Sequence, residues 1–273
     1  MNLEDHLGDI IRKARTAAGV SATTAARAAG LSADAFGVLE QSGETAAPLN
    51  FTALAGLIGL DAAKLAGIAQ GWRPEPRDLT RWRELHQITT TQRGNAVNCV
   101  LVWDESTREA ALFDTGWEAS PVVQIIEENR LQLRHLFITH SHEDHVAALG
   151  PLRQRFPGLL LHTNSYTAAP EHRNQTDEVV ALGGLHVTHR AVPGHADDGV
   201  IYLVDHWPHD PPRVAVVGDT LFAGSLARGF ISIELLKRKV EEEILTLPPD
   251  TLLCPGHGPV TTVGEERAHN PFI

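Results

Sequence analysis

Four potential metal ligands, His140, His142, Asp144 and His145, lie within six residues of one another. They closely follow the apolar run 136–138, whose composition predicts a β-strand. A strand that ends in such a loop holds imidazole and carboxylate groups on a rigid edge, where a metal ion binds without first ordering a flexible segment. The spacing therefore predicts a metal site, against the alternative of a solvated polar loop in a histidine-rich chain.

Three further candidate ligands follow apolar, strand-like runs in the same way. His195 follows residues 185–192, Asp219 ends the run 214–219, and His257 comes shortly after residues 252–253. Each lies beside a glycine, which lets the backbone turn tightly. Taken singly, each could be an ordinary turn residue. Together with the first cluster they supply five histidines and two aspartates, enough for two adjacent metal sites that share one carboxylate.

The elements expected around these residues belong to the α/β class. Residues 98–103 and 110–113 flank a turn at 104–107 and predict a β-hairpin. Residues 121–130 are expected to be helical, and 134–138 form the strand before the histidine loop. A helix is expected to start within that loop and to run to Phe156, with Asp144 and His145 in its first turn.

The composition of the chain argues against several classes of protein. The net charge of −11 disfavours nonspecific nucleic-acid binding by the chain as a whole. The two cysteines argue against a disulfide framework and fit a reducing cytoplasm. The apolar runs are too short to span a bilayer, and the N-terminus lacks a signal-peptide core. We therefore expect a cytoplasmic protein that does not associate with a membrane.

The first part of the chain differs from the rest in composition and in predicted secondary structure. Residues 1–71 are rich in alanine and leucine and predict five short helices, four of them capped by Ser21, Ser32, Asn50 and Asp61. The following segment, which contains two prolines and several charges, is expected to be a linker over residues 72–84. These signals predict a helical domain over 1–71 and a catalytic domain over 85–273.

The order of motifs in the second domain resembles the metallo-β-lactamase superfamily. The motifs are H-x-H-x-D-H at 140–145, Pro-Gly-His at 193–195, Gly-Asp-Thr at 218–220 and Pro-Gly-His-Gly at 255–258. Residues 218–225 and 255–262 are similar to the glyoxalase II branch, the hydroxyacylglutathione hydrolases. The resemblance implies an αββα sandwich with the metals at one edge.

The same resemblance implies a role for each candidate. It assigns His140, His142 and His195 to one metal ion, and Asp144, His145 and His257 to the other, with Asp219 bridging the two. It also implies that Asp144 is catalytic as well as a ligand, and that Asp114 holds the ligand loops. Arg228 is the one candidate for a contact with an anionic substrate group, although a surface salt bridge would explain it equally well.

Ligands of this kind indicate a hydrolytic reaction. Nitrogen and oxygen donors suit two divalent ions, with zinc as the first expectation and iron or manganese as alternatives. A metal-bound hydroxide would attack a small thioester or ester, and a thiol leaving group with a pKa near 8.5 departs without a strong general acid. The alternatives are a persulfide dioxygenase with one iron, and a lactonase.

Residues 12–43 resemble the Cro/C1 repressor-type family, which implies a helix-turn-helix. The expected recognition helix, 32–38, contains no Arg, Lys, Asn or Gln to read a base edge. Residues 1–78 hold seven Lys and Arg against nine Asp and Glu, a net charge of −2. We therefore predict that this domain serves packing, homo-oligomer formation or covering of the substrate cleft. The alternative is a DNA-binding regulator whose metallo-hydrolase fold acts as a sensor.

Overall fold

The computed structural model describes residues 2–273 and begins with five helices. They are α1 (Leu7–Ala17), α2 (Ala22–Ala29), α3 (Ala33–Ser42), α4 (Phe51–Ile58) and α5 (Ala62–Ala69). The four predicted caps are confirmed: Ser21, Ser32, Asn50 and Asp61 each accept a hydrogen bond from the backbone N–H three residues further on. Strong local signals at the helix ends account for this agreement.

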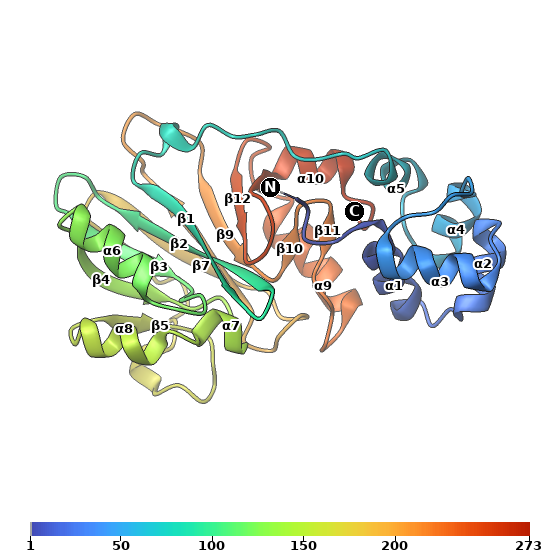
Figure 1. Ribbon diagram of the computed structural model, residues 1–273. Helices are drawn as coiled ribbons and strands as arrows, with labels where there is room; N and C mark the ends of the chain where they lie inside the picture. The colour runs from blue at the N-terminus through green and yellow to red at the C-terminus, as the bar shows by residue number, and fades with distance from the viewer. Residues whose placement is uncertain (1) are drawn as a thin grey trace.

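The helical region and the rest of the chain share one hydrophobic core. Buried side chains of α1–α5, such as Phe36 and Leu54, belong to the same cluster as Val217, Leu236 and Leu253. Figure 1 shows these helices at one end of the molecule, next to α9 (Ile233–Lys239) and α10 (Val263–His269). The boundary at 72–84, DNA binding and homo-oligomer formation stay predictions.

The remainder of the chain folds into two sheets. The first contains, in spatial order, β1 (Leu85–Gln92), β2 (Asn95–Trp103), β3 (Glu109–Phe113), β4 (Gln132–Phe137) and β5 (Leu160–His162). The second contains β13 (Thr261–Thr262), β12 (Leu252–Pro255), β9 (Val214–Gly218), β8 (Val200–Asp205), β7 (Leu185–Ala191) and β6 (Val180–Leu182). A short hairpin of β10 (Leu221–Phe222) and β11 (Ser225–Leu226) follows β9.

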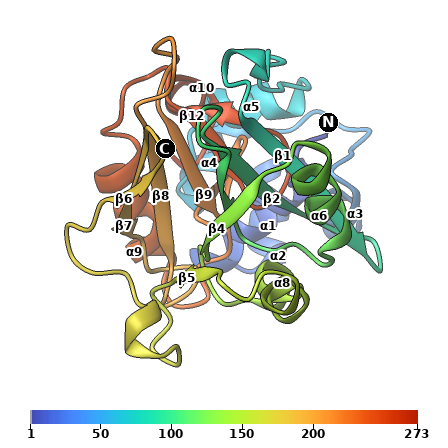
Figure 2. The same cartoon turned by 90° about the vertical axis from the view of Figure 1, so that its left-hand side faces the viewer.

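Alternating side chains make the sheets pack face to face. Along β2, Val100 and Val102 point into the core between the sheets, where they meet Tyr202 of β8. Leu101 and Trp103 point to the opposite face, which α6 (Ser120–Glu128) and α8 (Leu149–Arg155) cover. The second sheet is covered by α9, α10 and the π-helical turn η3 (Val240–Ile244) on its outer face (Figure 2). The expected αββα sandwich is confirmed, as is the hairpin of β2 and β3.

The single helix expected from the histidine loop to Phe156 is wrong. The structure divides it into α7 (Glu143–Val146) and α8. Thr115, at the end of β3, donates its backbone N–H to the His145 carbonyl over 2.9 Å and accepts the Ala148 N–H on its Oγ1 over 3.0 Å. The His145 carbonyl and the Ala148 N–H thus form hydrogen bonds with Thr115 in place of helical ones. The helix is therefore interrupted between His145 and Ala148.

Within residues 2–273, no single helix has the length and apolar character needed to cross a membrane. Among the described residues, only the pair α4 and α5 reaches the length and apolar composition of a membrane span when the two helices are taken together. The chain bends by 119° between them. Both carry side chains that are buried in the shared core, among them Leu54 and Leu65.

We expect Phe36→Ala to lower the free energy of unfolding by about 3–5 kcal/mol, because Phe36 is fully buried in the shared core. Chemical denaturation should show one transition for the whole chain, shifted to lower denaturant. Val38→Ala, on the same helix but 55% exposed, is the control and should change stability by less than about 0.5 kcal/mol. Two separate transitions, with only the first affected, would contradict a shared core.

Candidate metal centre

All seven predicted ligands meet at one edge of the sandwich. The parallel strands β3 and β4 end beside each other in the first sheet, as β9 and β12 do in the second. The residues that follow β4, β7, β9 and β12 therefore converge, since the carboxyl ends of these strands lie at the same edge. The side chains brought together are His140, His142, Asp144, His145, His195, Asp219 and His257.

Three overlapping groups of these side chains have ligand atoms within 4.8 Å of one another. In the first, the Nε2 atoms of His140 and His195 each lie 3.0 Å from Nδ1 of His142. In another, Nε2 of His257 lies 3.4 Å from Oδ2 of Asp144. Imidazole nitrogens and carboxylate oxygens that converge in this way are typical of a metal site.

Asp219 lies between these groups. Its Oδ1 atom is 3.3 Å from His145 Nε2, and its Oδ2 atom is 3.4 Å from His257 Nε2 and 3.6 Å from His195 Nε2. One carboxylate thus faces histidines of both sets, which is the position that the sequence predicts for a bridging ligand.

Some of the converging nitrogen and oxygen atoms lack a hydrogen-bond partner in the described part of the chain, as expected if they bind a metal ion. His145 Nε2 and Asp219 Oδ1 are buried, and within residues 2–273 neither finds a hydrogen-bond partner of adequate geometry. Buried polar atoms without partners are costly unless another group, such as a metal ion, satisfies them. Gly256 keeps this space open, because a Cβ atom there would lie 2.3 Å from Asp219 Oδ1 and 2.6 Å from His145 Cε1.

The carboxylate of Asp114 fixes the histidine loop through three hydrogen bonds. Its Oδ1 accepts the Thr139 backbone N–H, and its Oδ2 accepts the Thr139 hydroxyl and His145 Nδ1–H, each over 2.8 Å. A proton fixed on Nδ1 leaves Nε2 of His145 free to bind a metal. His195 and His257 are oriented in the same way, by carbonyl oxygens 2.8 Å and 2.6 Å from their Nδ1 atoms.

The carboxylates also control the charge of two histidines. Burial lowers the pKa of His145, but Asp114 and Asp219 beside it outweigh burial and raise that pKa to about 10. Burial likewise lowers the pKa of His257, whereas its contacts with Asp144 and Asp219 raise it to about 11. Imidazole binds a metal only in its neutral form, so a metal ion bound here at neutral pH would have to displace one proton from each of these histidines.

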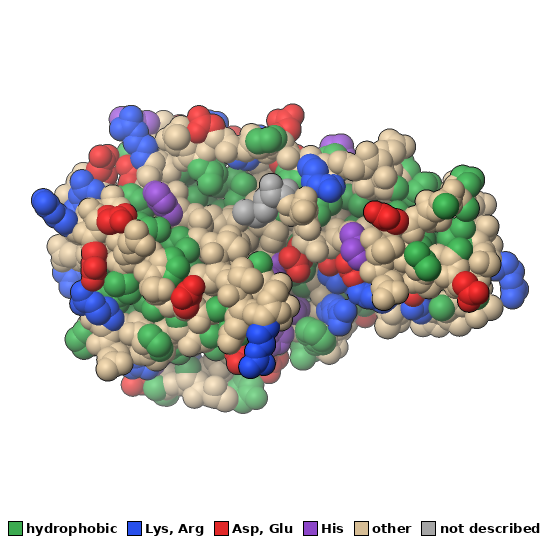
Figure 3. Space-filling view, in the orientation of Figure 1, with side chains coloured by type: hydrophobic (Ala, Val, Ile, Leu, Met, Phe, Trp, Pro, Cys, Tyr) green, Lys and Arg blue, Asp and Glu red, His purple; other side chains and the backbone are tan. Residues whose placement is uncertain are grey.

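A cleft of about 390 Å³ opens over the ligands, and four residues of the N-terminal region line it. They are Glu4, Asp5, Asp9 and Lys13, and none was predicted from the sequence, where no motif connects them with residues far along the chain. Arg228, the predicted substrate contact, is exposed at the edge of the same cleft. In Figure 3, histidine and acidic side chains gather where the helical region meets the sheets.

Comparisons with known proteins agree with this geometry. A profile described as the metallo-beta-lactamase superfamily matches residues 93–257, which include all seven predicted ligands. Hydroxyacylglutathione hydrolase GloC of Haemophilus influenzae is 32% identical over 215 residues, covering 70% of this chain and 97% of that protein. Human mitochondrial persulfide dioxygenase ETHE1 is 33% identical over 200 residues, covering 68% of this chain and 76% of that protein.

One similar solved structure contains metal. The crystal structure of TTHA1623 in a di-iron-bound form is 26% identical, has a TM-score of 0.55, and covers 69% of this chain and 100% of that one. The profile match leaves α1–α5 outside its range, so the helical region is an addition to the part of the fold that the profile describes.

We expect Asp114→Ala to weaken metal binding by about 10–100-fold, because His145 then loses the acceptor that orients its ring. Competition with a chromophoric chelator would measure the affinity. The matched control is Asp104→Ala, which removes another buried carboxylate that accepts backbone N–H groups, in this case from Thr107 and Gly184. Equal affinities for Asp114→Ala and the unaltered protein would contradict the orienting role.

Proposed function

The chain belongs to the metallo-beta-lactamase superfamily, and we propose that it is a metal-dependent hydrolase that cleaves a small thioester. An acylglutathione-like thioester is the leading substrate class. The observation that carries the proposal is the convergence of five histidines and two aspartates beneath a cleft, with Asp219 between the histidines. The similarity to a hydroxyacylglutathione hydrolase supports this choice of substrate.

In this proposal the side chains divide into two sets. His140, His142 and His195 would hold one divalent ion, and Asp144, His145 and His257 would hold the other, with Asp219 placed to serve both. Zinc is the first expectation, and iron or manganese suits the same donors. Ions bound there would supply an activated water at neutral pH and Lewis-acid stabilisation of the carbonyl oxygen.

Asp144 is the candidate for proton transfer. It borders the cleft, with its side chain 22% exposed. Burial raises its pKa, but the hydrogen bond with His257 and the charges of His145 and His257 together outweigh burial and leave the pKa below its ordinary value. An ionised carboxylate at the cleft can accept a proton from the attacking water. The thiol half of the substrate has a pKa near 8.5 and departs as a thiolate without a strong acid.

Neither cysteine is available as a nucleophile. Cys99 and Cys254 are both fully buried, and burial raises the pKa of each thiol to about 12. Only the thiolate form of cysteine attacks a carbonyl readily. Attack by water, rather than by a cysteine thiolate, is therefore the reaction that we propose.

Persulfide dioxygenation is the second candidate. The human dioxygenase is as similar to this chain as the hydrolase is, at 33% against 32% identity. An iron site made of two histidines and one carboxylate could be formed from a subset of the proposed ligands. The two candidates differ in whether oxygen is consumed.

We expect the purified protein to release free thiol from S-lactoylglutathione, and to lose this activity after chelation and regain it after metal is restored. An oxygen electrode should record no uptake with glutathione persulfide, whichever metal is bound. Oxygen uptake by the iron-loaded protein without thioester hydrolysis would establish the dioxygenase instead. Hydrolysis of a lactone but not of the thioester would establish a lactonase.

A further inference from the structure

We propose that the N-terminal helical region forms part of the substrate site. A cavity between α1 and the segment 227–233 would bind the carboxylate-bearing, non-reacting part of the substrate. This inference rests on the proposed thioester hydrolysis. In that reaction the acyl group of the substrate must reach the histidines and aspartates at the sheet edge. It gives α1 a direct role in recognition, in addition to its role in packing.

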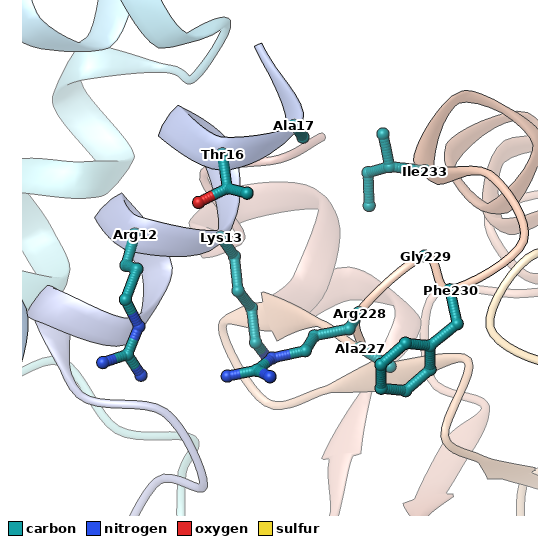
Figure 4. Close-up of a pocket in the computed structure, with 9 residues that line it drawn as sticks. All are labelled: Arg12, Lys13, Thr16, Ala17, Ala227, Arg228, Gly229, Phe230 and Ile233. Atoms are coloured by element: carbon teal, nitrogen blue, oxygen red, sulfur yellow. The ribbon is translucent and has the colours of Figure 1, made fainter. Parts of the chain in front are cut away.

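The cavity has a volume of about 440 Å³ and lies between two distinct walls. Residues of α1, from Arg12 to Ala17, form one wall, and residues 227–233 form the other. In Figure 4 the side chains of Arg12 and Lys13 extend from α1, while Arg228 extends toward α1 from the opposite wall. Lys13, Arg228 and Phe230 also line the cleft over the proposed ligands, so the two spaces adjoin each other.

The charge of the cavity favours an anion. Arg12, Lys13 and Arg228 line it, and no lining residue is acidic. The neighbouring cleft differs, because Glu4 and Asp9 are among the acidic residues that line it and would repel a substrate carboxylate. Because Lys13 and Arg228 also line the cleft, an anionic group is most favoured on the cavity side, where these two cations are joined by Arg12 and no lining residue is acidic.

The three cations differ in how many donors they have left. Lys13 Nζ is occupied by Asp5 and by the Leu226 carbonyl, at 2.5 and 2.9 Å. Arg12 contacts Asp9 and the Glu40 carbonyl through two of its nitrogens, and a guanidinium carries five N–H donors, so others stay free.

Arg228 is the least committed of the three. Its side chain is exposed and makes no hydrogen bond or ion pair to any of residues 2–273 that the structure describes. A guanidinium with free donors matches the two oxygens of a carboxylate. Arg228, assisted by Arg12, is thus equipped to bind one.

Phe230 connects the cavity to the reacting end. Its ring is 63% exposed, and its centroid lies 5.3 Å from that of His195 and 5.8 Å from that of His142. Ala17 and Ile233 add apolar surface to the lining of the cavity. An extended thioester would pass Phe230, with its acyl group at the histidines and its anionic end between α1 and Arg228.

The test compares two thioesters with the same acyl group. S-Lactoylglutathione carries carboxylates on its thiol half, whereas the lactoyl thioester of N-acetylcysteamine carries none. In metal-loaded protein, we expect Arg228→Ala and Arg12→Ala each to lower the ratio of kcat/KM, charged over neutral substrate, by about tenfold, mainly through KM. The control Arg27→Ala removes an exposed arginine of α2 and should leave the ratio unchanged.

If both substrates are hydrolysed and the ratio is the same in both arginine variants, the cavity does not bind the carboxylate and the inference is overturned. If the unaltered protein hydrolyses neither thioester, the proposed function fails, and binding of S-hexylglutathione measured by calorimetry decides the inference separately. Binding that weakens about tenfold in Arg228→Ala but not in Arg27→Ala supports the cavity. Absent or equal binding overturns it.

Discussion

The buried hydrogen bond between Asp114 and His145 is the interaction on which the arrangement of the proposed metal centre depends. Asp114 directly follows β3 and joins it to the loop after β4, because the same carboxylate accepts hydrogen bonds from Thr139 and His145. It also favours the positive charge of His145 before a metal binds. Together with the backbone bonds from Val200 N–H to the Thr139 carbonyl and from Thr115 N–H to the His145 carbonyl, this anchor fixes the histidine loop relative to Asp219, which comes from the other sheet.

The helical region is integrated into the enzyme fold. Its buried side chains share a core with β9 and β12, the two strands that precede Asp219 and His257. The buried carboxylate of Asp5 accepts hydrogen bonds from Lys13 and from Ser225, on the hairpin after β9. These contacts place the start of the chain over the cleft, where a helical domain tethered only by a linker would not be held. Recognition of substrate by α1 is consistent with that placement.

Local signals and the residues of the recurring metal-ligand motifs were predictable from the sequence, whereas long-range contacts outside those motifs were not. Ser32 and Asn50 were identified as caps because the groups that they bond are three residues away. His195 and His257 were identified because each follows an apolar run and a glycine. The interruption between α7 and α8 depends on Thr115, 30 residues before His145, and no periodicity in the helix indicates it. The position of Lys13 depends on Leu226, 213 residues away, so its place beside the cleft required the structure.

The number of metal ions bound per chain tests the central claim most directly, since one carboxylate is proposed to serve two sites. Elemental analysis by plasma mass spectrometry, after expression with added metal and gel filtration, should give about two ions per chain. Asp219→Ala should reduce this to near zero, while Asp250→Ala, at an exposed position, should not change it. One ion or none per chain in the unaltered protein, or two ions in Asp219→Ala, would contradict the account.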